Sequence, residues 1–67
     1  MKNRIRVARA EIRMTQQQLA DAAGVSRQTI HAIESGRFIP STLLTLKIAR
    51  IFSRAVEELF ELEEGDF

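Results

Sequence analysis

The chain has 67 residues, one histidine and no cysteine, and its formal net charge is +1. This length predicts a single domain, residues 1–67, whose core is only marginally stable by itself. Without cysteine, disulfides and thiolate metal sites are excluded, and one histidine leaves no credible zinc site, so we expect no metal and no cofactor. Apolar runs are too short to span a membrane and no signal peptide is recognisable, so a cytoplasmic protein is expected.

The charges divide the chain into two unlike parts. Residues 1–54 hold all ten lysines and arginines against three acidic residues, a net charge of +7, whereas residues 55–67 hold six acidic residues and no base, a net charge of −6. A basic body suits a nucleic-acid partner, and an acidic tail (residues 61–67) has to point away from that partner. Composition alone leaves solvated charges without a partner as the alternative.

A first helix is predicted from about Asn3 to Arg13. Ile5, Ala8 and Ile12 recur at helical spacing and fall on one face, which we expect to point inward. Arg6 and Arg13 are expected to face the solvent.

Two short helices joined by a tight turn are predicted between Thr15 and Gly36. Thr15 can cap the first of them, and Gln18, three residues later, can complete a capping box. Gly24 ends that helix, because glycine adopts the left-handed backbone conformation without a steric penalty. Ser26 is suited to cap the second helix.

The spacing of small and apolar residues in this stretch is typical of a helix-turn-helix of the DNA-binding kind, over residues 16–35. Ala20 is small enough for the second helix to cross it closely, Gly24 makes the turn, and Ile30 anchors the second helix on the first. The positions between them are filled by Leu19, Val25 and Ile33.

The outer face of the second helix carries Arg27, Gln28, His31 and Ala32. An arginine can donate paired hydrogen bonds to guanine, a glutamine can pair with adenine, and an alanine can lie against a thymine methyl group. Arg27 and Gln28 are the first candidates for base reading, because the N-terminal turn of such a helix enters the groove most deeply. For His31, a DNA contact and a plain surface histidine are equally open.

After Pro40, a further helix capped by Ser41 is predicted to run to about Phe52. Leu43 and Leu46 fall toward its polar side, either as ordinary exposed leucines or as part of a subunit contact. Its inward face is expected to comprise Leu44, Ile48, Ile51 and Phe52.

The last part of the chain changes from helical to alternating character. Val56, Leu59 and Phe60 give a short helix its inward stripe, and residues 60–63 then alternate apolar and acidic side chains as a strand does. We expect residues 1–3 and 60–63 to pair as a small antiparallel ribbon near a two-fold axis, with Phe60 and Leu62 at or beside a subunit contact. Residues 65–67 are predicted to be a loose end.

From Ile5 to Phe60 the sequence resembles the phage-repressor and Cro-like family of helix-turn-helix regulators, also called the XRE family. The most specific part runs from Met14 to Arg37. The matching text is RAEIRMTQQQLADAAGVSRQTIHAIESGRFIPSTLLTLKIARIF, followed by VEELF. The resemblance implies an all-α fold, a compact five-helix lambda-repressor-like domain with its core at about residues 5–60, to which a short terminal β-ribbon could be added.

The resemblance also implies roles for individual residues. It pairs Arg9 with Glu34, which would tie the first helix to the end of the recognition helix; a plain surface arginine is the alternative. It places Gln16 over a DNA phosphate, and helix N-termini in general favour anions. Capping alone is the alternative for the two serines and for Thr15. The residues expected to contact phosphates are Thr15, Gln16, Ser26, Thr29, Arg37 and Ser41.

The clearest departure from the family is at Ser53, Arg54 and Ala55. The family usually has a glycine there, followed by a residue with a capping oxygen. A left-handed Ser53 costs of order 1 kcal/mol, and Ala55 has no oxygen to cap the next helix. A continuous helix through Phe52 and Val56 is therefore a real alternative, although the packing of the family favours a break.

These observations predict a sequence-specific regulator of transcription that binds double-stranded DNA, in particular a repressor acting as a homodimer on a near-palindromic operator. The alternative is an antitoxin-like protein-interaction module whose DNA binding is autoregulatory. The lack of a nucleophile–base pair, a phosphate loop or a metal cluster argues against an enzyme. No residues are left for a ligand-sensing domain, so no small-molecule ligand is expected.

Overall fold

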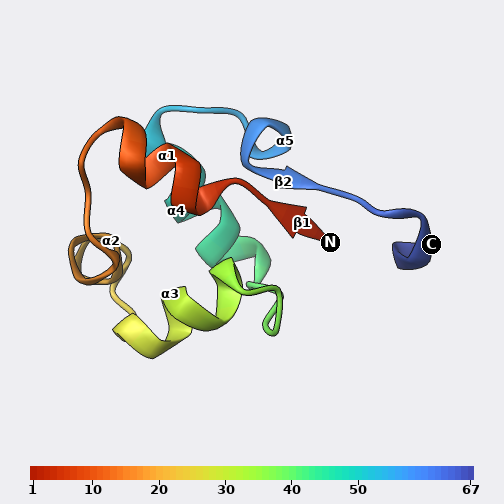
Figure 1. Cartoon of the computed structure of the whole chain (residues 1–67), viewed down its shortest axis with the longest axis horizontal. Coiled ribbons are helices and arrows are strands. Elements are labelled where there is room, and N and C mark those ends of the chain that lie inside the picture. Colours follow the sequence, from red (N-terminus) through yellow and green to blue (C-terminus); the bar gives the residue numbers. More distant parts are fainter.

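The computed structural model describes residues 1–67 and consists of helices surrounding a small core, with a two-stranded ribbon at one end (Figure 1). The predicted five-helix architecture and the terminal ribbon are both confirmed. No helix has the length and apolar character needed to cross a membrane. The elements in chain order are β1 (Lys2–Asn3), α1 (Ile5–Glu11), α2 (Gln16–Ala23), α3 (Arg27–Glu34), α4 (Thr42–Phe52), α5 (Val56–Leu59), β2 (Phe60–Glu61) and a 3-10 turn (Glu64–Asp66).

The core takes its largest side chains from all five helices, which explains why the short helices hold together. Burial of each large aliphatic side chain contributes roughly 1.5–3 kcal/mol, so these contacts outweigh the weak intrinsic stability of helices this short. The largest fully buried side chains are Ile5, Leu19, Ile30, Ile33, Ile48 and Leu59.

The α2–turn–α3 unit has the caps that the sequence predicts. The Thr15 hydroxyl oxygen accepts a hydrogen bond from the Gln18 amide at 3.0 Å, and the Gln18 side chain accepts one from the Thr15 amide at 2.9 Å. Gly24 ends α2 in the left-handed conformation, with a φ of 74°. The Ser26 oxygen caps α3 by accepting from the Thr29 amide at 3.1 Å. Local sequence signals therefore determine where both helices begin and where α2 ends.

The first helix is shorter than the predicted span from Asn3 to Arg13, and the inward orientation predicted for Ile12 is wrong. Asn3 belongs to strand β1, and α1 ends at Glu11. Arg13 has a φ of 54°, so the chain turns away from the helix axis at this point. Ile12 is exposed as a result, because helical spacing no longer decides where its side chain points.

The break between α4 and α5 is present, and the alternative of one continuous helix is wrong. Ser53 adopts the left-handed conformation, with a φ of 53°, and ends α4. The missing capping oxygen at Ala55 is partly compensated by Glu58, whose carboxylate accepts a hydrogen bond from the Ala55 amide at 3.0 Å.

Ser53→Gly is expected to raise the free energy of unfolding by about 0.5–1 kcal/mol. Glycine relieves the left-handed strain of about 1–2 kcal/mol but loses more backbone entropy on folding. Urea denaturation measures the change, and Gly24→Ala is the matched control. An added Cβ at Gly24 meets no atom within 4 Å, so its left-handed backbone alone should make that variant less stable. A less stable Ser53→Gly would show that the serine side chain matters more than the strain.

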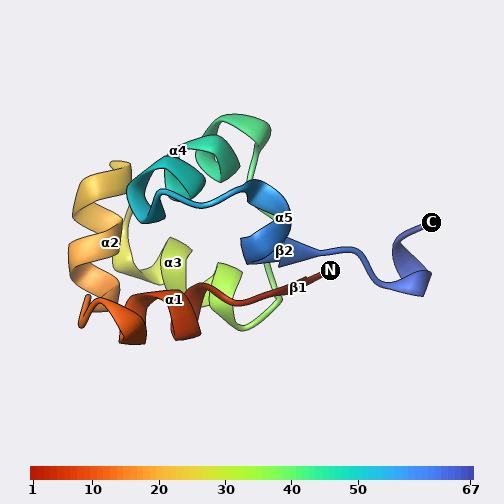
Figure 2. The same cartoon turned by 90° about the horizontal axis from the view of Figure 1, so that it is seen from above.

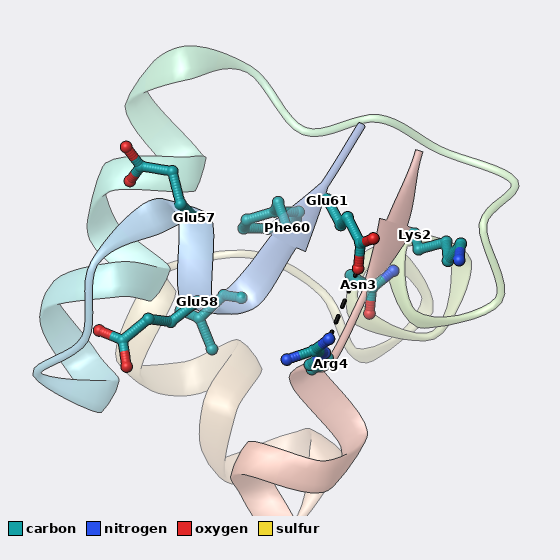
Figure 3. Close-up of a pocket in the computed structure, with 8 residues that line it drawn as sticks. Lys2, Asn3, Arg4, Glu57, Glu58, Phe60 and Glu61 are labelled. Atoms are coloured by element: carbon teal, nitrogen blue, oxygen red, sulfur yellow. Dashed lines mark hydrogen bonds and ion pairs between the residues drawn. The ribbon is translucent and has the colours of Figure 1, made fainter. Parts of the chain in front are cut away.

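The ribbon joins the two ends of the described chain. Lys2 pairs with Glu61 and Asn3 with Phe60 in an antiparallel register. The Arg4 amide donates to the Leu59 carbonyl at 2.8 Å, which extends this pairing to the start of α1. Figure 3 shows the polar hollow beside the ribbon, where Arg4 and Glu61 approach to 3.5 Å.

The prediction that residues 65–67 are a loose end is wrong, because this segment is ordered by contacts with the start of the chain. The N-terminal ammonium of Met1 lies 3.0 Å from carboxylate oxygens of both Glu63 and Asp66. The Asp66 carboxylate also accepts a hydrogen bond from the Glu63 amide at 2.7 Å, which closes the 3-10 turn. The turn nevertheless projects beyond the helical body at the ribbon end in both views (Figures 1 and 2).

Candidate nucleic-acid interface

The outer face of α3 forms a polar hollow. Arg27, Gln28, His31 and Arg37 line a shallow depression of about 260 Å³ that has no apolar lining residue. All four are exposed, whereas Ala32 is half-buried. The depression therefore contains two guanidinium groups, an amide and an imidazole. Such a set of donors favours a partner rich in hydrogen-bond acceptors, such as phosphate oxygens and the edges of guanine and adenine.

Arg37 reaches this hollow because the chain turns sharply after α3. Gly36 has a φ of 81°, in the region that favours glycine. The Arg37 Nε donates to the Ser35 hydroxyl at 3.2 Å, and that hydroxyl donates to the Ala32 carbonyl at 3.1 Å. These bonds hold the Arg37 side chain against the end of α3.

A shielded ion pair between Arg9 and Glu34 fixes the end of α3, the helix that carries the hollow. Arg9 Nε and Nη2 donate to the two carboxylate oxygens of Glu34 at 2.6 and 3.0 Å, the paired geometry that makes such contacts strong. The side chain of Glu34 is 1% exposed and that of Arg9 14%. Arg9 Nη1 also donates to the Met14 carbonyl at 2.9 Å. One guanidinium group therefore joins α1, the end of α3 and the turn that leads into α2.

Gln16 connects this ion pair to the exposed face. Its amide nitrogen donates to Glu34 Oε1 at 3.2 Å and lies 3.5 Å from His31 Nδ1. Glu34 thus orients Gln16, and Gln16 places the start of α2 beside the face of α3 that carries the candidate base readers.

The ionisation of Glu34 follows from its neighbours. Burial by itself would raise the pKa of this carboxyl group, but hydrogen bonds from Arg9 and Gln16 and the positive charges of Arg9 and Arg6 outweigh burial and hold the pKa below its ordinary value. The Arg6 side chain lies 3.9 Å from Glu34 Oε1. The same hydrogen-bonded contact raises the pKa of Arg9. Both groups are charged at neutral pH.

Three of the four hydroxyl groups expected to contact phosphates cap helices, and the fourth, that of Thr29, lies beside a cap. The Ser41 hydroxyl oxygen accepts a hydrogen bond from the Leu44 amide at 3.2 Å and caps α4. Thr15 and Ser26 cap α2 and α3 in the same way, each by accepting from an amide three residues later. The Thr29 hydroxyl lies 3.0 Å from that of Ser26. Capping uses the oxygen as an acceptor, so the hydroxyl proton of Thr15 or Ser41 stays available to an anion. Ser41 lines a different hollow, beside the α2–α3 turn.

The sequence comparisons agree with this geometry. A family model described as helix-turn-helix matches residues 5–59. The chain belongs to the helix-turn-helix family of XRE type. This is a family of DNA-binding regulators of transcription rather than of enzymes.

Relatives described as uncharacterized HTH-type transcriptional regulators are similar over almost their full length. YgzD of Bacillus subtilis is 47% identical over 64 residues, which cover 96% of this chain and 97% of the relative. A protein of Methanocaldococcus jannaschii is 46% identical over 66 residues, which cover 98% of this chain and 100% of the relative. A protein of Archaeoglobus fulgidus is 44% identical over 66 residues, which cover 98% of this chain and 93% of the relative.

Sequence reasoning missed Asn3, which contacts the recognition helix of this helix-turn-helix protein. The Asn3 side-chain nitrogen donates to the Ile33 carbonyl at 2.8 Å, and its oxygen accepts from the Ile5 amide at 3.3 Å. Asparagine side chains commonly accept a hydrogen bond from the amide two residues later, so the bond to Ile5 had a local signal. The bond to the Ile33 carbonyl joins residues 30 positions apart, and no local sequence signal predicts it.

The two candidate dimer residues lie in different surroundings. Phe60 is 7% exposed and packs in the core of its own chain, so little of its surface is left for a partner. Leu62 is 62% exposed and has no place in that core.

Proposed function

We propose that this protein is a repressor that binds, as a homodimer, a near-palindromic operator in double-stranded DNA. The observation that carries the proposal is the hollow on α3, where Arg27, Gln28 and His31 stand together on the outer face of a recognition helix. These side chains offer the donors and acceptors that distinguish base pairs in the major groove. Arg37 and Gln16, which lie beside the C-terminal part of this helix, supply phosphate contacts that fix its register on DNA.

Two copies are proposed because one recognition helix reads too little DNA. The eight residues of α3 span roughly 12 Å, the length of three or four base pairs. A second copy related by two-fold symmetry doubles the sequence that is read, and the operator then has matching symmetry. Such a dimer represses by occupying the operator and excluding polymerase, and it acts on the nucleoid in the cytoplasm, where bacterial and archaeal DNA lies.

Selection of bound sequences from a random pool of double-stranded DNA tests this proposal. The expected result is one enriched sequence made of two inverted half-sites whose centres lie one helical turn apart, ~34 Å. Enrichment of a single half-site without symmetry would contradict the homodimer. Binding without enrichment of any sequence would contradict sequence-specific recognition. Transcription in vitro from a promoter that carries the selected site then shows whether occupancy represses.

A further inference from the structure

An uncovered apolar surface lies on α4 and the loop before it. Ile39, Leu43 and Leu46 are 63%, 66% and 55% exposed. Leu46 lines two hollows at once, one of about 370 Å³ that reaches the ribbon and one of about 390 Å³ that includes Lys47 and Arg50. We call these five residues the α4 surface. Exposed apolar side chains gathered beside basic groups are typical of a protein-interaction site.

The C-terminal segment has the opposite character. In residues 62–67, Leu62 and Phe67 are 62% and 93% exposed, and every charged residue is acidic. This segment projects past the helical body in both views (Figures 1 and 2). Lys47, Arg50 and Glu64 take part in none of the ion pairs within the chain. The α4 surface is therefore apolar and basic, and the C-terminal segment is apolar and acidic, so their charges are complementary.

We infer that a second copy of this chain docks on the α4 surface, and that residues 62–67 of each copy lie on the α4 surface of the other. The inference rests on the proposed homodimer and names its interface. Leu62 and Phe67 cover the exposed leucines of α4, and Glu64 approaches Lys47 and Arg50 of the partner copy. A two-fold axis repeats both contacts, because such an interface uses the same surfaces on both copies.

The arrangement of the elements supports this docking. The α3–α4 loop, the ribbon and the C-terminal segment lie at the same end of the molecule, away from α2 (Figures 1 and 2). Leu43 and Lys47 border the α2–α3 turn, so the α4 surface runs from the ribbon end along α4, and the partner's segment lies along this helix. The polar hollow on α3 remains open to DNA.

The C-terminal segment is also long enough. Three extended residues and the three-residue 3-10 turn together span at most ~16 Å, whereas the eight residues from Leu43 to Arg50 on a helix span roughly 10 Å. The segment can therefore follow the exposed face of α4 from its first turn to Arg50.

Sedimentation equilibrium of the full chain without DNA is the first test. The wild type is expected to dimerise at micromolar concentration, and Leu46→Glu and Leu62→Glu are each expected to weaken the dimer at least tenfold. Val7→Glu is the matched control, because Val7 is an apolar residue of α1 that is 58% exposed and lies outside the α4 surface. A monomeric wild type would overturn the inference. Two variants that dimerise as tightly as the control would also overturn it.

A charge exchange tests whether the contact is between copies. One variant carries Lys47→Glu and Arg50→Glu, and the other carries Glu64→Lys. Each alone is expected to dimerise several-fold more weakly, because like charges then face each other across the interface. Mixing the two restores opposite charges at both contacts, so the heterodimer is expected to form more tightly than either homodimer. A mixture no tighter than its components would overturn the docking of the segment.

The interface and the proposed function fail in different ways. A dimer that responds to these substitutions but enriches no DNA sequence would overturn the proposed function and leave the interface standing. A dimer that binds a symmetric operator and ignores the substitutions would overturn the interface and leave the function standing.

Discussion

Glu34→Ala is expected to lower the free energy of unfolding by about 3 kcal/mol. Removing one partner of a buried ion pair typically costs ~3–5 kcal/mol, because the other charge stays behind without compensation. The lower end of this energy range applies here, because the Arg9 side chain is 14% exposed and can be partly hydrated once Glu34 is removed. Domains of this length are stable by roughly 3–10 kcal/mol in total, so the substitution takes away much of the fold's stability. The thermal midpoint should fall by ~12–24 °C.

Glu11→Ala is the control for this effect. Glu11 pairs with Arg54 at 2.7 Å, as closely as Arg9 pairs with Glu34, but the side chains of Glu11 and Arg54 are 49% and 36% exposed. Exposed pairs contribute ~0–1 kcal/mol, so this variant should melt within a few degrees of the wild type. Equal destabilisation in the two variants would show that shielding of the Arg9–Glu34 pair does not determine its contribution.

The same carboxylate makes stability depend on pH. The pKa of Glu34 is lower in the folded chain than its ordinary value of 4.5, so the folded state binds this proton less readily than the unfolded state does. The stabilisation is complete above the unfolded pKa and is lost as the pH falls through the folded pKa. Urea unfolding between pH 3 and 7 should show this decline in the wild type. Glu34→Gln should have a flatter profile below pH 5.

The helix-turn-helix unit could be predicted because its signals are local. A threonine with a glutamine three residues later, a glycine at the turn and a serine before α3 are sufficient to set where both helices begin and where α2 ends. Within this unit, the identities of the buried residues followed from helical spacing. The candidate site followed for the same reason, since the residues of one exposed helix face lie together whatever surrounds the helix.

What could not be predicted depends on contacts between distant residues. Ile12 has helical spacing, but the chain leaves the helix axis at Arg13, and nothing near it in sequence marks that turn. Asn3 contacts α3 only because the ribbon carries it there. The 3-10 turn near Asp66 depends on the ammonium of Met1, at the far end of the chain. Short-range patterns carry no information about such partners.

Gln28→Ala and Arg37→Ala are expected to impair DNA binding in different ways. Gln28 stands in the first turn of α3, where a side chain meets base edges, so its removal should cost about 1–3 kcal/mol on the selected operator and relax the preference at one base pair per half-site. Arg37 lies past the end of α3, and the proposed function gives it a contact with a flanking phosphate. Its removal should weaken operator and scrambled DNA about equally and reduce the slope of log K against log salt by roughly one unit for each phosphate that Arg37 neutralises.

Binding to both DNAs at several salt concentrations separates the two effects. Lys2→Ala is the matched control, because it also removes one positive charge, from the ribbon instead of the α3 hollow, and should leave both affinity and slope unchanged. If a Gln28→Ala variant keeps the wild-type preference for the operator over scrambled DNA, Gln28 does not read base sequence. If Gln28→Ala and Arg37→Ala weaken both DNAs in parallel, α3 does not read the bases, and the attraction of this basic surface for DNA is electrostatic alone.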